Sequence, residues 1–154
     1  MNLLDGIQIA CTESFEIYKL LGGELYYTRF SQLLTRSVLF ESSDLRMADP
    51  DFNRMIFNIN DLLTADTSML SPDDVRAFAG RVREVLLEQP HVVVIVIAST
   101  DLSYGLSRIW LGSTKPVSEN VFVVSSVDDA TEIVDRIRRE RRDAHSSQTL
   151  PKSL

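Results

Sequence analysis

The feature that most constrains the fold is an unbroken apolar run at residues 92–98, VVVIVIA. A strand with one solvent-exposed face alternates apolar and polar residues, and this run does not. It therefore predicts the central strand of a parallel sheet that helices cover on both faces. Because the longest apolar run is far shorter than the roughly 20 residues that cross a bilayer, the sequence predicts no membrane span.

The chain around this run alternates predicted strands and helices. We expect strands at residues 7–11, 15–22, 55–60 and 121–124, the first two paired as a hairpin. We expect helices at residues 26–40, from Pro72 to before Pro90, from Asp101 to about Gly112 and from about Ser126 to Arg142. The order is β-β-α-β-α-β-α-β-α, which predicts an α/β fold with a mainly parallel sheet of four or five strands flanked by four helices.

Two segments of this prediction depend on weaker patterns. The first helix is inferred from the helical spacing of Phe30, Leu33, Leu34 and Val38, and the polar residues 41–53 after it are predicted to be a connection. In the strand at residues 55–60, Asn58 and Asn60 alternate with apolar residues. This alternation predicts that one face of the strand is only partly buried.

Composition limits the class of protein. The 154 residues are 44% hydrophobic and 25% charged, which is typical of a globular domain, here expected over residues 1–142 with a flexible tail at 143–154. The net charge of −6 disfavours a nucleic-acid partner. Cys11 is the single cysteine and the N-terminal residues lack a basic signal region, so we expect a cytoplasmic protein.

The sequence contains no motif that indicates catalysis or a cofactor. One Cys and two His cannot provide the usual set of zinc ligands. The sequence also lacks the glycine-rich loops that bind phosphate and the glycine-flanked serine of a nucleophile elbow. We therefore predict a protein without catalytic residues, metal or cofactor. A hydrolase that uses Asp61 or Asp66 as a general base is the least favoured alternative.

Hydroxyl and acidic side chains follow each predicted parallel strand. The carboxyl ends of parallel strands meet at one edge, where open α/β sheets bind ligands. The predicted partner-binding residues at this edge are Asp61, Ser68, Ser71, Ser99, Thr100 and Asp101. Helix capping accounts for the same residue types equally well.

The helix after the apolar strand carries Tyr104 and Arg108 four residues apart. Both lie off its apolar stripe of Leu102, Leu106 and Ile109, so we expect them to project together near this edge. They could clamp a carboxylate of a protein partner, or simply cover the helix.

The segments from Asp49 to Val134 resemble the bacterial STAS-like proteins, named after sulfate transporters and the anti-anti-sigma factor SpoIIAA. The similarity lies in the strand that ends in Asp61, the SPDDVRA start at residues 71–77, the apolar run, and DLSYGLSR at residues 101–108. It is greatest to small stand-alone SpoIIAA-like proteins that are also described as similar to CRAL-TRIO lipid-transfer domains. The resemblance implies helices mainly on one side of the sheet and a non-catalytic regulatory or protein-binding module.

Signalling members of that family carry a phosphorylatable Ser or Thr at the start of the helix after the third strand. By position, the resemblance makes Ser68 and Ser71 the candidate phosphoacceptors. Leu70 and Pro72 stand where the family pattern has an Asp and a second hydroxyl residue.

Two further predictions concern the apolar surface. The leading prediction for function is a non-enzymatic module that binds a protein partner. The runner-up is carriage of a small apolar ligand or lipid between the sheet and the first helix, walled by Tyr26, Tyr27, Phe30, Leu33 and Leu34. A homodimer is predicted because four helices in a short chain would leave part of the sheet uncovered.

Overall fold

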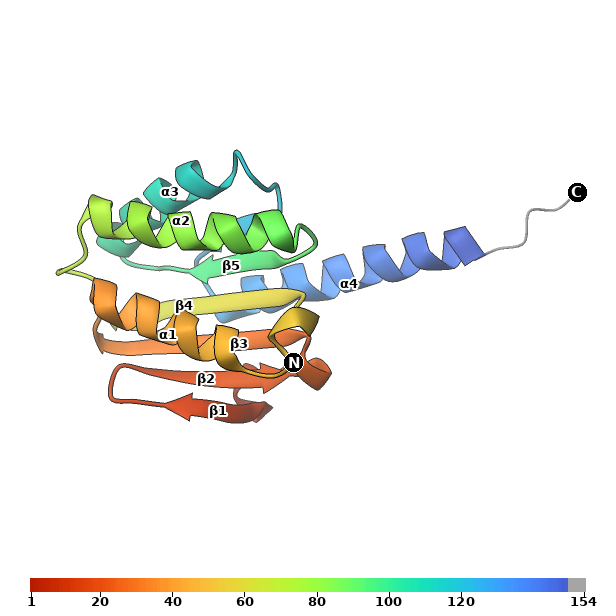
Figure 1. The fold of residues 1–154 in the computed structure, drawn as a ribbon, viewed down its shortest axis with the longest axis horizontal. Helices are drawn as coiled ribbons and strands as arrows, with labels where there is room; N and C mark the ends of the chain where they lie inside the picture. The colour runs from red at the N-terminus through yellow and green to blue at the C-terminus, as the bar shows by residue number, and fades with distance from the viewer. Residues whose placement is uncertain (150–154) are drawn as a thin grey trace, which may run out of the picture.

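Six strands form one sheet in the order in which they occur along the chain (Figure 1). The first three, β1 (Ile7–Cys11), β2 (Phe15–Leu20) and β3 (Leu25–Leu33), make an antiparallel meander. The last three, β4 (Phe57–Asp66), β5 (Val93–Ile97) and β6 (Val121–Val124), run parallel to each other and to β3. The computed structural model describes residues 1–149.

Four helices follow the strands from β3 onward. They are α1 (Arg36–Ala48), α2 (Pro72–Glu88), α3 (Asp101–Thr114) and α4 (Val127–Thr149). Each of the first three connects neighbouring parallel strands and steps the same way across the sheet, so crossovers of one hand place all three on one face. The helix α4 follows the last strand and packs on the opposite face (Figure 1). We call the face under α1, α2 and α3 the cavity face, and the face under α4 the α4 face. None of the helices within residues 1–149 has the length and apolar character needed to cross a membrane.

The α/β class and the mainly parallel sheet are confirmed, but the prediction of a helix at residues 26–40 is wrong. Residues 25–33 form β3, and α1 begins at Arg36, with Thr35 accepting a hydrogen bond from the Val38 N–H at 3.3 Å. Both faces of β3 are buried over most of its length, so its apolar residues do not alternate with polar ones and match a helical spacing by chance. The sheet therefore has six strands rather than four or five.

The segment at residues 41–53, predicted to be a connection, instead contains most of α1. Its helical pattern is hidden because several residues on its inward face are polar. Ser42, Ser43 and Arg46 are all buried against the sheet side of the helix. A search for apolar periodicity cannot detect a helix of this kind.

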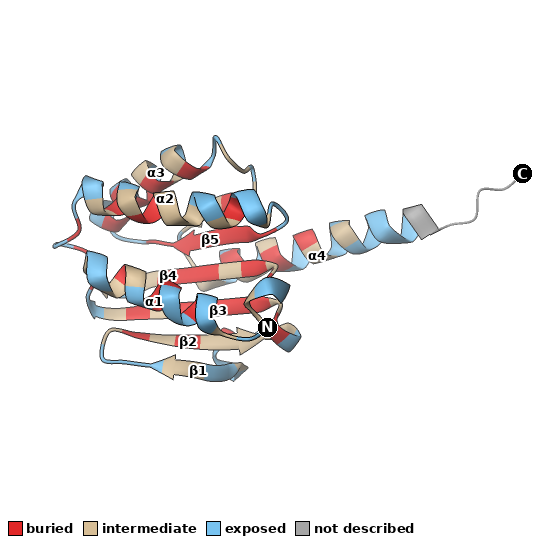
Figure 2. Cartoon of the chain, in the orientation of Figure 1, coloured by how far each residue is buried: buried red, intermediate tan, exposed pale blue. Residues whose placement is uncertain are grey.

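The apolar run at β5 is buried on both faces, as predicted (Figure 2). Val94 and Val96 pack in the core under α1, α2 and α3, whereas Val93, Ile95 and Ile97 pack under α4. The chain's own helices supply this cover. The homodimer stays a prediction, but the uncovered sheet face from which it was inferred is not present at β5.

The predicted starts of the last three helices agree well with the structure, and the predicted end of the last helix does not. Ser71 and Thr100 cap α2 and α3. The helix α4 continues to Thr149, so it includes residues 143–149 of the predicted tail. Residues 150–154 lie outside the part of the chain that is described.

Candidate functional site: a cavity between the sheet and three helices

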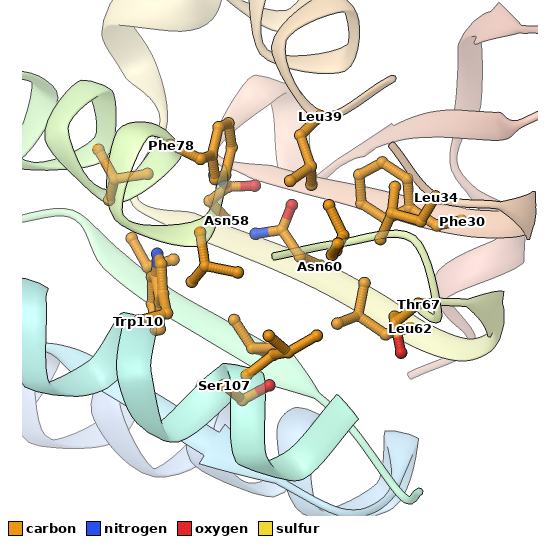
Figure 3. Close-up of a pocket in the computed structure, with 16 residues that line it drawn as sticks. Phe30, Leu34, Leu39, Asn58, Asn60, Leu62, Thr67, Phe78, Ser107 and Trp110 are labelled. Carbon is orange, nitrogen blue, oxygen red and sulfur yellow. The ribbon is translucent and has the colours of Figure 1, made fainter. Parts of the chain in front are cut away.

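A cavity lies between the cavity face of the sheet and the helices α1, α2 and α3 (Figure 3). Its volume is about 630 Å³, counting the part that is open to solvent. Strands β3, β4 and β5 form its floor, and Leu39, Phe78 and Trp110 bring one apolar wall from each helix. Hollows lined mostly by apolar side chains are the usual sites of small organic ligands.

Two asparagines interrupt the apolar lining. Along β4, Phe57 and Ile59 point to the α4 face, so the pleat turns Asn58 and Asn60 toward the cavity (Figure 3). Asn60 is only 8% exposed. The Oδ1 atoms of both side chains are buried, and neither has a hydrogen-bond partner within the described residues.

Such unpartnered amides are unfavourable in a folded protein. Burying an amide without a hydrogen bond costs roughly 1–3 kcal/mol by protein mutational data. Because the oxygen and nitrogen of an amide exchange places when the group turns over, each side chain offers either an acceptor or a donor to a molecule in the cavity. The amides therefore give a largely apolar cavity two sites for polar recognition.

Arg46 of α1 brings a positive charge to the same region. It is 3% exposed, and its Nη1 donates to Thr28 Oγ1 at 2.8 Å. No carboxylate within residues 1–149 lies close enough to pair with it. Burial lowers the pKa of Arg46 to about 10, which leaves the guanidinium charged at neutral pH.

The asparagines and Arg46 are close together in the fold. Thr28, which accepts the Arg46 hydrogen bond, is the neighbour of Asn60 in the register of β3 and β4. Arg46 lines a second hollow, of about 370 Å³ counting its open part, and Asn58 lines both hollows. We call Thr28, Arg46, Asn58 and Asn60 the buried polar patch.

Several predicted edge residues act as caps. Ser71 Oγ accepts from the Asp74 N–H at 3.1 Å, and Thr100 Oγ1 accepts from the Ser103 N–H at 3.1 Å. The Ser68 N–H donates to Asp66 Oδ1 at 3.0 Å. The capping alternative thus accounts for the two helix starts.

Asp61 differs from the other predicted edge residues because it is buried. It lies within β4 on the α4 face, is 3% exposed, and accepts from the Tyr27 hydroxyl and from the Leu63 N–H at 2.9 Å. Burial, and then the hydrogen bond to Asp61, raise the pKa of Tyr27, so its hydroxyl remains a donor. A substrate would reach this carboxylate poorly, whereas Asp66, the other candidate general base, is exposed.

The remaining predicted residues lie at the surface. Ser68, Ser99, Asp101, Tyr104 and Arg108 are exposed. A buried contact of 3.0 Å between the hydroxyls of Thr67 and Ser103 joins the segment after β4 to the start of α3. Leu102 is 51% exposed, so its predicted inward position is wrong; Ser103 and Ser107 face inward with Leu106 instead.

Sequence reasoning missed the buried polar patch. Its signal is the pair of amides in an apolar strand, which predicts a partly buried face; Asn58 is half-buried, but Asn60 is buried. Arg46 was missed because its segment carried no apolar periodicity. Within residues 1–149, no three His, Cys, Asp or Glu side chains are grouped closely enough to hold a metal ion.

The fold and the cavity together define an α/β protein with an internal, largely apolar site and a buried polar patch beside it. No protein-family model matches the chain, and no curated protein matches its sequence.

Proposed function

We propose that the protein is a non-enzymatic binding protein for a small, mostly apolar molecule, which it holds in the cavity beneath α1, α2 and α3. The observation that carries this proposal is the pair of buried, unpartnered amide oxygens of Asn58 and Asn60 in an apolar cavity. Leucine or valine would pack at these positions without leaving a polar atom unpaired. A ligand with one polar group would satisfy the amides and place its apolar part against the walls.

The site differs from the apolar wall that the sequence predicted. Phe30 and Leu34 line the cavity, but Tyr27 belongs to the α4 face and Leu33 is 43% exposed. The cover comes from three helices rather than from one. The proposed ligand is the same in kind, a small apolar molecule.

The resemblance to STAS-like proteins is compatible with this proposal. It implies helices mainly on one side of the sheet, and three of the four helices lie on one face. Membership of that family, a bacterial signalling role and a cytoplasmic location are part of the same proposal.

Native mass spectrometry of freshly purified protein, followed by titration with 1-decanol, tests the proposal. We expect a co-purifying small mass or saturable binding of the alcohol. Val96→Phe, which fills the cavity from β5, should abolish both. Val124→Phe is the matched control, because Val124 packs on the α4 face. Absence of binding in the wild type, or equal loss in both variants, would reject the cavity as the site.

A second candidate function is capture of a protein partner at the predicted edge. The observation that favours it is exposed apolar surface there: Met69, Leu102 and Tyr104 are 65%, 51% and 50% exposed. Tyr104→Ala or Asp101→Ala should then weaken partner capture in a pull-down, whereas Val96→Phe should not. Light scattering at increasing concentration tests whether a second copy is the partner, as the predicted homodimer requires.

A further inference from the structure

The buried polar patch contains a cation without a counter-ion. Arginine carries five N–H donors, and the hydrogen bond from Arg46 Nη1 to Thr28 uses one of them. Thr28 is a neutral residue and is fully buried. An isolated charge away from water is unfavourable unless an opposite charge accompanies it.

Other cations close to this region already have acidic partners. Arg81, which lines the hollow beside Arg46, pairs with Asp44 at 2.5 Å. Lys19 pairs with Asp49 at 3.1 Å and with Asp51 at 2.8 Å. Arg46 is therefore the cation whose charge a ligand would balance, and it lines the second hollow, which shares Asn58 and Phe78 with the cavity.

From this arrangement we infer that the ligand is a monocarboxylic acid with an apolar tail, and that its carboxylate binds Arg46. This inference rests on the proposed function of the cavity. The amides of Asn58 and Asn60 turn their NH₂ groups to the carboxylate, and the tail lies among Phe78, Leu106 and Trp110. A guanidinium binds a carboxylate through two parallel hydrogen bonds.

The number of charges favours a carboxylate over a phosphate. Arg46 supplies a single positive charge, which balances one carboxylate. A phosphate monoester carries about −1.5 to −2 at neutral pH and would bring excess negative charge into a buried site. The other members of the buried polar patch are neutral, so they contribute hydrogen bonds without charge.

Calorimetric titration with decanoate and 1-decanol tests the inference, because the two probes share a tail and differ in the head group. We expect wild type to bind decanoate at least about tenfold more tightly, and Arg46→Met to lose this preference while it still binds decanol. Arg76→Met is the control, since Arg76 is exposed, pairs with Asp73 and lies outside both hollows. Arg76→Met should retain the preference.

A measurement on wild type alone keeps the inference testable if Arg46→Met does not fold. Decanoate labelled with ¹³C at the carboxyl carbon reports its ionisation in the NMR spectrum. We expect the bound acid to remain ionised at a pH where half of the free acid is protonated, because an adjacent cation favours the carboxylate. Protonation of the bound acid at a higher pH than the free acid would overturn the inference, because burial without a partner has that effect.

The possible results separate the two proposals. Binding of decanol with no preference for decanoate would overturn the role of Arg46 and leave the cavity as the site. Loss of the preference in Arg81→Met but not in Arg46→Met would show that the carboxylate binds Arg81 instead of Arg46, and would overturn the inference. Binding of neither probe would reject the proposed function itself.

Discussion

The two faces of the sheet treat buried polar groups in opposite ways. On the α4 face, Asp61 is buried but accepts hydrogen bonds from Tyr27 and Leu63, and most of the buried side chains on this face are apolar. On the cavity face, Asn58 and Asn60 lie on the same strand with unpartnered oxygens beside a cavity. One strand thus carries a satisfied polar group on one side and unsatisfied ones on the other.

This difference separates a polar group that serves the structure from one that is available to a ligand. A buried carboxylate with its donors in place stabilises one packing arrangement. A buried amide without a partner lowers stability, and a bound ligand can recover what was lost. The comparison predicts that substitutions will act mainly on stability at the α4 face and mainly on binding at the cavity face.

The largest expected effect is loss of packing on the α4 face. Ile59 is fully buried there, and Ile59→Ala should lower the free energy of unfolding by about 4 kcal/mol. Leu106→Ala should lower it by about 2 kcal/mol, because Leu106 already borders a cavity and has fewer contacts to lose. Urea unfolding followed by circular dichroism measures both values. Equal losses would contradict the proposed difference in packing.

A smaller effect is expected from the polar pair on the α4 face. Tyr27→Phe should lower the free energy of unfolding by about 2 kcal/mol, because it removes one hydrogen bond to the buried Asp61 carboxylate. Tyr18→Phe is the control, since its hydroxyl contacts Glu16 at 3.0 Å in a less buried position. The same chemical unfolding measurement should give a loss of about 0.5 kcal/mol or less for this control. An unchanged free energy of unfolding in Tyr27→Phe would show that Asp61 does not need this donor.

On the cavity face, replacing a polar side chain should raise the free energy of unfolding rather than lower it. Asn60→Leu should raise the free energy of unfolding by about 1 kcal/mol, because it replaces a buried, unpartnered amide by an apolar group of similar size. Asn58→Leu should have a weaker effect, since Asn58 is only half-buried. Thermal and chemical unfolding without ligand measure both. A loss of stability in Asn60→Leu would mean that the amide has a structural role.

The smallest effect is expected at Arg46. In Arg46→Met, removal of a buried charge opposes loss of the hydrogen bond to Thr28, so stability at neutral pH should change by about 1 kcal/mol or less. A loss of about 3 kcal/mol or more would indicate a purely structural arginine.

Comparison of wild type with Arg46→Met also tests how stability depends on pH. Burial lowers the pKa of Arg46 to about 10, below its usual value, so above pH 10 the unfolded chain binds more protons than the folded one. The stability of wild type relative to Arg46→Met should therefore rise as the pH increases above about 10. Unfolding curves of both proteins across this interval measure the difference. A difference independent of pH would show that burial does not perturb Arg46.

The sequence alone determined the α/β class, the doubly buried β5, and the starts of α2 and α3 at Ser71 and Thr100. These features depend on local signals: an unbroken apolar run, and cap residues next to the helices that they cap. The same signals predict the edge residues, of which Asp61 is buried.

Tertiary structure decided the features that carry the proposed function. Whether residues 25–33 form a strand or a helix depends on pairing with β2 and β4, which lie elsewhere in the chain. The burial of Arg46 and the missing partners of Asn58 and Asn60 depend on how α1, α2 and α3 pack over the sheet. A cavity is space that side chains from distant segments fail to fill, and no local pattern of residues encodes such a space.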